Sequence, residues 1–263
     1  MLGATAARAD GSRELARTGP LALGAETAAV LGLAVAMDEA SGGAVPDRCR
    51  WCEPSAFDRW GHDALAHGDR RRLGLASHVG PFVLLPVGAL AGVMVPAYQA
   101  GRGAHAWQNA WIVVNGFLLT TATVSATKQA TARRRPAYTY GHEADSEFAG
   151  TPAEEHLSFF SGDTAWAFDL AASGAALAYL RGYRTAPWLA WGGGAVALAT
   201  GTLRVMSEAH WPTDALAGAL FGTAVGVGVP LLVHPRASAP SSAVQIVGAH
   251  RRGVTTLAVS GSF

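Results

Sequence analysis

Long stretches without charged residues divide this chain. No Asp, Glu, Lys or Arg occurs in four windows, which are 73–101, 103–127, 185–203 and 215–235. Each window holds at least 19 residues, and a helix needs about 20 residues to cross the hydrocarbon core of a bilayer. Two further apolar stretches contain one acidic residue each, Glu26 within 21–37 and Asp169 within 164–180. The pattern therefore predicts helices that span a membrane.

The predicted fold is an all-α bundle of about six transmembrane helices. We expect the spans at about 20–37, 77–98, 106–127, 162–180, 186–203 and 213–233. Composition agrees, because half of the 263 residues are hydrophobic and only 15% are charged, against about 25% in soluble domains. The 32 glycines suit helices that pack closely in a membrane.

Positive charges predict the orientation of the spans. If the arginines before the first span are cytoplasmic, the later cytoplasmic segments carry Arg102, then Arg181 and Arg184, then Arg236 and two arginines of the tail, with no acidic residue among them. That distribution is what the positive-inside rule requires. The outer segments are then 38–76, 128–161 and 204–212.

Three regions follow from this topology. Residues 1–19 form a cytoplasmic N-terminal segment, 20–233 a membrane-embedded domain in which 38–76 is an outer cap, and 234–263 a weakly ordered cytoplasmic tail. The first span can be read as a signal sequence or as an uncleaved anchor. Asp10, Glu14 and Glu26 favour the anchor, since acidic residues are unusual in the charged and apolar parts of a signal sequence.

Two function classes receive little support from composition. A net charge of +1 implies no strongly basic face, so nucleic acid is not expected as a partner. Cys49 and Cys52 provide half of a zinc site at most, and no second pair completes it. In an oxidising periplasm they can form a local disulfide, and two free thiols in a loop are the alternative.

Three fragments of the chain share a spacing that chance rarely produces. They are Lys128 with Arg135-Pro136, then Ser161-Gly162-Asp163, then Arg204 with His210 and Asp214. Together they resemble the three-part signature of the type 2 phosphatidic acid phosphatase superfamily, which reads Lys-x6-Arg-Pro, Pro-Ser-Gly-His and Ser-Arg-x5-His-x3-Asp. The sequence departs from this signature at Phe160, Asp163 and Leu203, which replace Pro, His and Ser. All three fragments fall at the outer face of the predicted topology.

The resemblance implies a role for each matched residue. Lys128, Arg135 and Arg204 would neutralise a phosphate group, and Ser161-Gly162 would place the start of a helix against it. His210 would attack phosphorus to give a phosphohistidine, and Asp214 would orient the imidazole. No metal or cofactor is implied.

The implied function is hydrolysis of a lipid phosphate or diphosphate at the outer leaflet. Candidate substrates are a polyprenyl diphosphate, phosphatidic acid and phosphatidylglycerol phosphate, and the implied location is a bacterial inner membrane with the site facing the periplasm. A lipid phosphotransferase would use the same site. Haloperoxidases share the phosphate-site residues but are soluble, and a transporter would show internal repeats, which this sequence lacks.

Asp163 occupies a position of special interest, because the family's histidine there protonates the leaving oxygen. An aspartate donates only while it is protonated, and its reference pKa is about 3.9. Four solutions remain open: a protonated Asp163, a leaving group that needs little protonation, another donor such as His142 or His156, or a protein that binds lipid phosphate without hydrolysing it. Asp169 lies deeper in the same span, where it is protonated or paired with another polar group.

Overall fold

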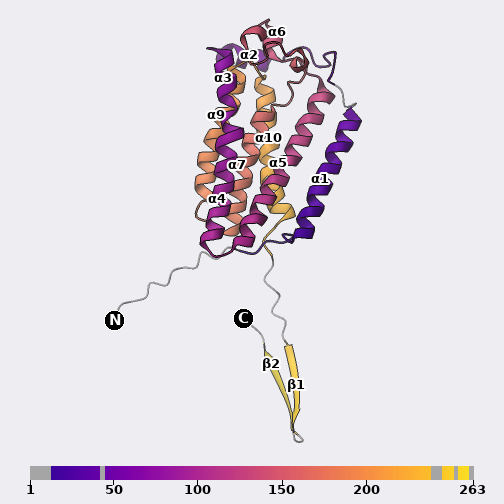
Figure 1. The fold of residues 1–263 in the computed structure, drawn as a ribbon, viewed down its shortest axis with the longest axis vertical. Helices are drawn as coiled ribbons and strands as arrows, with labels where there is room; N and C mark the ends of the chain where they lie inside the picture. Colours follow the sequence, from indigo (N-terminus) through magenta and orange to yellow (C-terminus); the bar gives the residue numbers. More distant parts are fainter. Residues whose placement is uncertain (1–12, 42–44, 238–244, 252–253, 261–263) are drawn as a thin grey trace, which may run out of the picture.

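Six long helical segments run side by side through the molecule (Figure 1). The computed structural model describes residues 13–41, 45–237, 245–251 and 254–260. The long segments are α1 (Pro20–Ser41), α3 to α4 (Arg70–Ser77, then η1 Gly80–Leu84, then Leu85–Gln99), α5 (Gly103–Thr131), α7 (Gly162–Arg181), α8 to α9 (Ala186–Trp188, then η4 Leu189–Gly193, then Gly194–Met206) and α10 with η5 (Pro212–Gly228, then Val229–Val233). Short helices join them: α2 (Ala56–Leu65), α6 (Pro136–Thr139), η2 (Glu143–Asp145) and η3 (Pro152–Glu154).

The prediction of an all-α membrane protein is confirmed. In the part of the chain that the structure describes, four helices are long and apolar enough to cross a membrane, namely Pro20–Ala40, Arg70–Gln99, Gly103–Thr131 and Pro212–Val233. The number of spans, six, stays a prediction, because α7 and the segment Ala186–Met206 are not among these four. Helix α7 has a physical reason to be less apolar: it lies inside the bundle and packs against α4, α5, α9 and α10, so most of its surface faces other helices.

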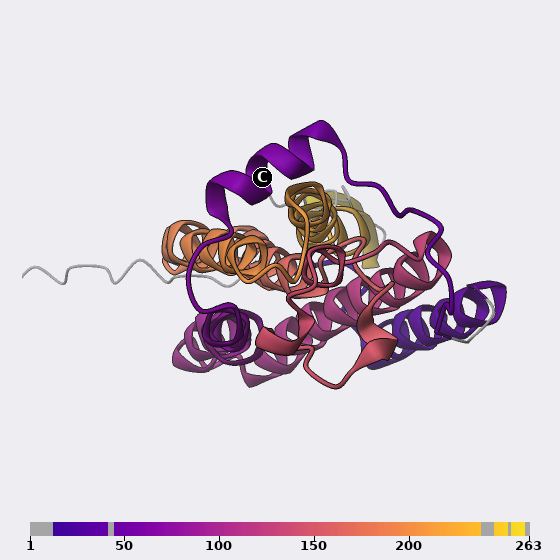
Figure 2. The same cartoon turned by 90° about the horizontal axis from the view of Figure 1, so that it is seen from above.

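Glycines bring α10 against α7. Gly218, Gly222 and Gly226 recur every four residues on one face of α10. A methyl group added at Gly222 would overlap the carbonyl oxygen of Ala165, and one at Gly226 would lie 2.5 Å from the carbonyl oxygen of Asp169. Small residues at this spacing allow two helix backbones to approach closely in a membrane. Helix α1, in contrast, lies at the edge of the bundle beside α5 (Figure 2).

The two ends of the bundle carry different segments. Basic residues predicted to be cytoplasmic, among them Arg102 and Arg236, lie at one end of the bundle, where the Arg236 Nε donates to the Leu180 carbonyl at 3.0 Å and Arg102 pairs with Glu14 at 3.0 Å. The Arg13 backbone N–H also meets the carbonyl of Arg181 there, at 3.1 Å. Helices α2, α3 and α6 cluster at the other end (Figure 1). The segments predicted to lie outside therefore share one end of the molecule.

The segment predicted as an outer cap contains α2 and most of α3. Ser55 begins α2 with a capping box, in which its side chain accepts from the Asp58 N–H while Asp58 accepts from the Ser55 N–H. Cys49 and Cys52 form a disulfide just before this helix, with their Cα atoms 5.5 Å apart.

The tail predicted to be weakly ordered includes a regular element. Strands β1 (Gln245–Arg251) and β2 (Val254–Ser260) form an antiparallel hairpin, in register from Gln245 opposite Ser260 to Arg251 opposite Val254. A weakly ordered tail over 234–263 stays a prediction.

Candidate active site

A cavity of about 410 Å³ lies at the end of the bundle that carries α2, α3 and α6. Six residues that the motifs single out line it, and they come from the end of α5, the start of α6, the start of α7, the end of α9 and the loop before α10. These six are Lys128, Arg135, Gly162, Asp163, Arg204 and His210. Residues that are more than 80 positions apart in the sequence are thus brought to one site.

Three cations reach this cavity, and two of them are fixed by other residues. The Arg135 side chain donates to the Glu154 carboxylate at 2.7 Å and to the Ala209 carbonyl at 2.8 Å. Arg204 pairs with Glu147 at 2.6 Å. Lys128 is half-buried in the last turn of α5. Both arginines are nearly inaccessible to solvent, at 2% and 3% exposed.

His210 contacts one of these arginines through its Nε2 atom. Arg135 Nη1 lies 3.2 Å from His210 Nε2, and a guanidinium only donates, so Nε2 is the unprotonated nitrogen. The other ring nitrogen, Nδ1, lies 3.6 Å from the Asp214 carboxylate and therefore carries the proton. Burial lowers the pKa of His210 well below its usual value, and the charges of Arg135, Arg204 and Lys128 lower it further. The imidazole is thus neutral, with its lone pair on the atom that faces the cations.

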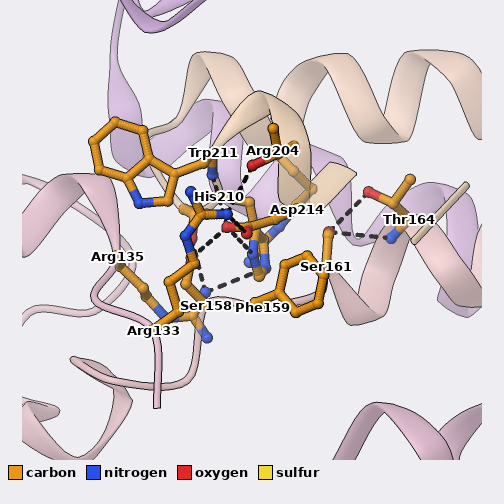
Figure 3. A network of polar contacts seen from close by, with 12 residues as sticks. Arg133, Arg135, Ser158, Phe159, Ser161, Thr164, Arg204, His210, Trp211 and Asp214 are labelled. Atoms are coloured by element: carbon orange, nitrogen blue, oxygen red, sulfur yellow. Dashed lines mark hydrogen bonds and ion pairs between the residues drawn. The ribbon is translucent and has the colours of Figure 1, made fainter. Parts of the chain in front are cut away.

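Asp214 is held in place from several sides (Figure 3). Its carboxylate accepts from the Ser158 hydroxyl at 2.5 Å, from the Trp211 backbone N–H at 2.9 Å, and from Arg133. The Trp211 bond closes the N-terminal cap of α10. These three donors leave the carboxylate little freedom to rotate.

Arg133 extends this network into the cap. Its guanidinium donates to Asp214 and to Asp58 in α2, the latter at 2.6 Å, and it lies 3.8 Å from the centre of the Trp51 ring. Arg133 is only 1% exposed and Asp58 is fully buried. Trp51 sits between the two bridged cysteines, and its carbonyl accepts from the Arg134 N–H at 3.2 Å. The disulfide loop therefore covers the arginine that fixes Asp214.

The start of α7 behaves as predicted for a capped helix. The Ser161 side chain accepts from the Thr164 N–H at 3.4 Å, and the Ser161 N–H donates to the Asp214 carbonyl at 3.1 Å. Ser161 therefore contributes to the site mainly by tying α7 to α10. Gly162 presents the first turn of α7 to the cavity.

Asp163 lies in the cavity wall as an ion-pair partner. Its Oδ2 atom is 3.1 Å from Arg204 Nε and 3.3 Å from His78 Nδ1. The carboxylate is only 6% exposed. The other expected substitutes for the family histidine do not line the cavity. His142 instead bonds Glu208 at 2.7 Å.

Sequence reasoning missed several residues of the site. His78 and Glu147 line the cavity and bond to each other at 2.9 Å, and Glu154 lines it beside Arg135. Burial raises the pKa of Glu147, but the His78 hydrogen bond and the Arg204 charge outweigh it and lower the pKa below its usual value. Among the missed residues only Asp58 has a local signal, since Ser55-x-x-Asp58 reads as a capping box.

Glu208 fixes the loop that carries His210. It is 1% exposed, and its carboxylate contacts Arg70 at 2.9 Å, His142 at 2.7 Å and His62 at 3.3 Å. These residues come from α2, α3 and the segment after α6, so Glu208 joins the cap to the loop. Among the residues that the structure describes, no cluster of His, Cys, Asp and Glu has the arrangement of a metal site.

One comparison with known proteins bears on this site. The profile of the PAP2 superfamily matches residues 109–238, about half of the chain. The matched region contains all three motif fragments and every cation of the cavity described above. No significant match occurs among curated proteins.

Proposed function

Because the chain belongs to the PAP2 superfamily, we propose that it is a membrane phosphatase that hydrolyses a lipid phosphate or diphosphate through a phosphohistidine on His210. Members of this superfamily are phosphatases, and membership suggests a phosphatase-type activity on lipid phosphates. The observation that carries the proposal is the cavity itself: three cations surround a neutral histidine whose second nitrogen faces a buried carboxylate.

The first step is attack on phosphorus. The three cations hold the phosphate oxygens and neutralise their charge, as preorganised donors do in phosphoryl transfer. The lone pair on His210 Nε2 forms the bond to phosphorus while the bond to the leaving oxygen breaks. The ring becomes positively charged, and Asp214, held by Arg133 and Ser158, stabilises that charge.

The second step is hydrolysis. Water attacks phosphorus, the bond between phosphorus and Nε2 breaks, and inorganic phosphate leaves. The cations serve both steps, so the proposed mechanism uses no metal ion.

The lining of the cavity supports a lipid substrate. Leu75, Phe82 and Trp166 form an apolar part of its wall, and Phe82 is 51% exposed on the outside of the bundle. An acyl or polyprenyl chain can therefore leave the cavity towards the membrane while the phosphate stays among the cations. The structural disulfide favours an oxidising compartment for this end of the protein, which agrees with the proposed periplasmic face of a bacterial inner membrane.

The test is phosphate release by the detergent-purified protein. A polyprenyl diphosphate and phosphatidic acid are the substrates, His210→Ala is the variant, and His67→Ala is its control, since His67 is exposed in the cap. We expect release by the unmodified protein and the control, and none by His210→Ala. A radiolabelled phosphate trapped on the protein should be stable in base, labile in acid and absent from His210→Ala. Saturable binding of both lipids without phosphate release would overturn the proposal in favour of a lipid-phosphate-binding protein, and transfer of phosphate to a second lipid would make the protein a phosphotransferase.

A further inference from the structure

For a lipid monophosphate, the proposed reaction requires a proton donor that Asp163 does not supply. The bond that breaks leaves a negative charge on the leaving oxygen, and an alkyl alcohol is a poor leaving group unless that oxygen is protonated. Asp163 Oδ2 is 3.1 Å from Arg204 Nε, and a carboxylate paired with a guanidinium is ionised and can only accept. A different group must act as the acid.

His78 has the chemistry for this role. It lines the same cavity, and its side chain is 38% exposed, whereas those of Asp163 and Arg204 are below 10%. Its Nε2 atom is held by the Glu147 carboxylate at 2.9 Å. Its Nδ1 atom lies 3.3 Å from Asp163 Oδ2 but makes no aligned hydrogen bond. Since both nitrogens face groups that only accept, the matching state of the ring is the imidazolium, with a proton on Nδ1 that no partner holds tightly.

The position of His78 also suits the leaving oxygen. Its ring centre is 5.7 Å from that of Phe82, which in turn is 5.4 Å from that of Trp166. These aromatic rings form the apolar part of the cavity wall, along which a lipid chain leaves. The oxygen that joins phosphorus to this chain therefore lies between the cations and the aromatic rings, next to His78.

We propose that His78 is the general acid of this phosphatase, in place of the histidine that the family carries at position 163. The role rests on the proposed function. In the first step the proton on Nδ1 moves to the leaving oxygen as the bond from phosphorus breaks. The product that leaves, an alcohol from a lipid phosphate or a lipid monophosphate from a diphosphate, carries this proton on its oxygen. In the second step the neutral His78 takes a proton from the attacking water. Glu147 holds the ring through Nε2, and Asp163 holds Arg204.

The test compares two leaving groups. Dodecyl phosphate releases an alkoxide that needs protonation, and p-nitrophenyl phosphate releases a phenolate that needs little. In His78→Asn we expect kcat on dodecyl phosphate to fall by roughly 10²–10⁴-fold, the usual scale of general acid catalysis, while kcat on p-nitrophenyl phosphate changes far less. His156→Asn is the matched control, because His156 does not line the cavity, and it should leave the ratio of the two rates unchanged.

A double variant distinguishes loss of the proton donor from a general loss of activity in His78→Asn. Adding Asp163→His to His78→Asn restores a histidine at the family position, and we expect activity on dodecyl phosphate to recover. Equal losses on both substrates, with no recovery in the double variant, would overturn the role of His78 while leaving the proposed function intact. No phosphate release from either substrate by the unmodified protein would overturn the proposed function, and the role of His78 with it.

Discussion

Arg133 gives the sharpest test of how the site is held together, because its neighbour Arg134 provides a control. Arg133→Met keeps the length of the side chain but removes the charge. Arg133 contacts two carboxylates, Asp58 and Asp214, and both of these are fully buried. Without the guanidinium the two carboxylates lose their shared counterion inside the protein.

The expected cost follows from burial. Removing one partner of a buried ion pair costs about 3–5 kcal/mol, because the other charge is left without compensation. Loss of the guanidinium contact with Trp51 adds about 0.5–2 kcal/mol. In Arg134→Met the lost pair is exposed, since the side chains of Arg134 and Glu155 are 39% and 28% accessible, and such pairs contribute about 0–1 kcal/mol. We therefore expect the free energy of unfolding to fall by at least about 3 kcal/mol in one variant and by less than about 1 kcal/mol in the other.

The assay is titration with sodium dodecyl sulfate in mixed micelles, followed by far-UV circular dichroism. Phosphate release should decline with stability in Arg133→Met, because Asp214 then loses a donor that orients it towards His210. Adding Asp58→Asn to Arg133→Met removes one of the two orphaned charges and should recover part of the lost stability. Equal losses in the two arginine variants, or no recovery in the double variant, would refute the reasoning.

Two other predictions concern packing and pH. Gly222→Ala should destabilise the bundle by about 1–3 kcal/mol or more, since the added methyl group overlaps the backbone of α7. Gly32→Ala should be nearly neutral, because nothing lies within 4 Å of its Cβ position. Thermal unfolding of the two variants in detergent measures the difference. Burial raises the pKa of Glu208, but its two histidines and its arginine outweigh burial and lower the pKa from 4.5 to about 2. The folded pKa is thus the lower one, so this stability is present above pH 4.5 and is lost as the pH falls towards 2. Denaturant titrations across that range should show a shallower pH dependence in Glu208→Gln.

The helices could be predicted because a membrane span is recorded in the local composition. The windows without charge correspond to α4, α5, α9 and α10. They can be found from the sequence without knowing which residues are in contact in the fold. The ends were less predictable: the span expected at 77–98 belongs to a helix that begins at Arg70, since Asp69 caps a polar first turn there. Such a turn carries no hydrophobic signal, although it is helical.

The residues of the site also fall into a predictable group and an unpredictable one. Lys128, Arg135, Arg204 and His210 could be predicted from their spacing, and they line one cavity. The residues that support them could not be predicted, because each acts across a large separation in the sequence. Arg133 and Asp58 are 75 positions apart, and His78 and Glu147 are 69 apart. Nothing local distinguishes Arg133 from Arg134, yet the first is buried and the second is half-buried.

The charge of the cavity suggests how substrate is bound. Besides His78, three cations line it, and three carboxylates, Asp163, Glu147 and Glu154, line it with them. Both arginines therefore already hold a carboxylate before any ligand enters. A phosphate group gains only the difference between its own contacts and those it replaces, so free phosphate should bind weakly. Affinity for a lipid must then come largely from its chain on the apolar wall, and phosphate that has lost this chain can leave.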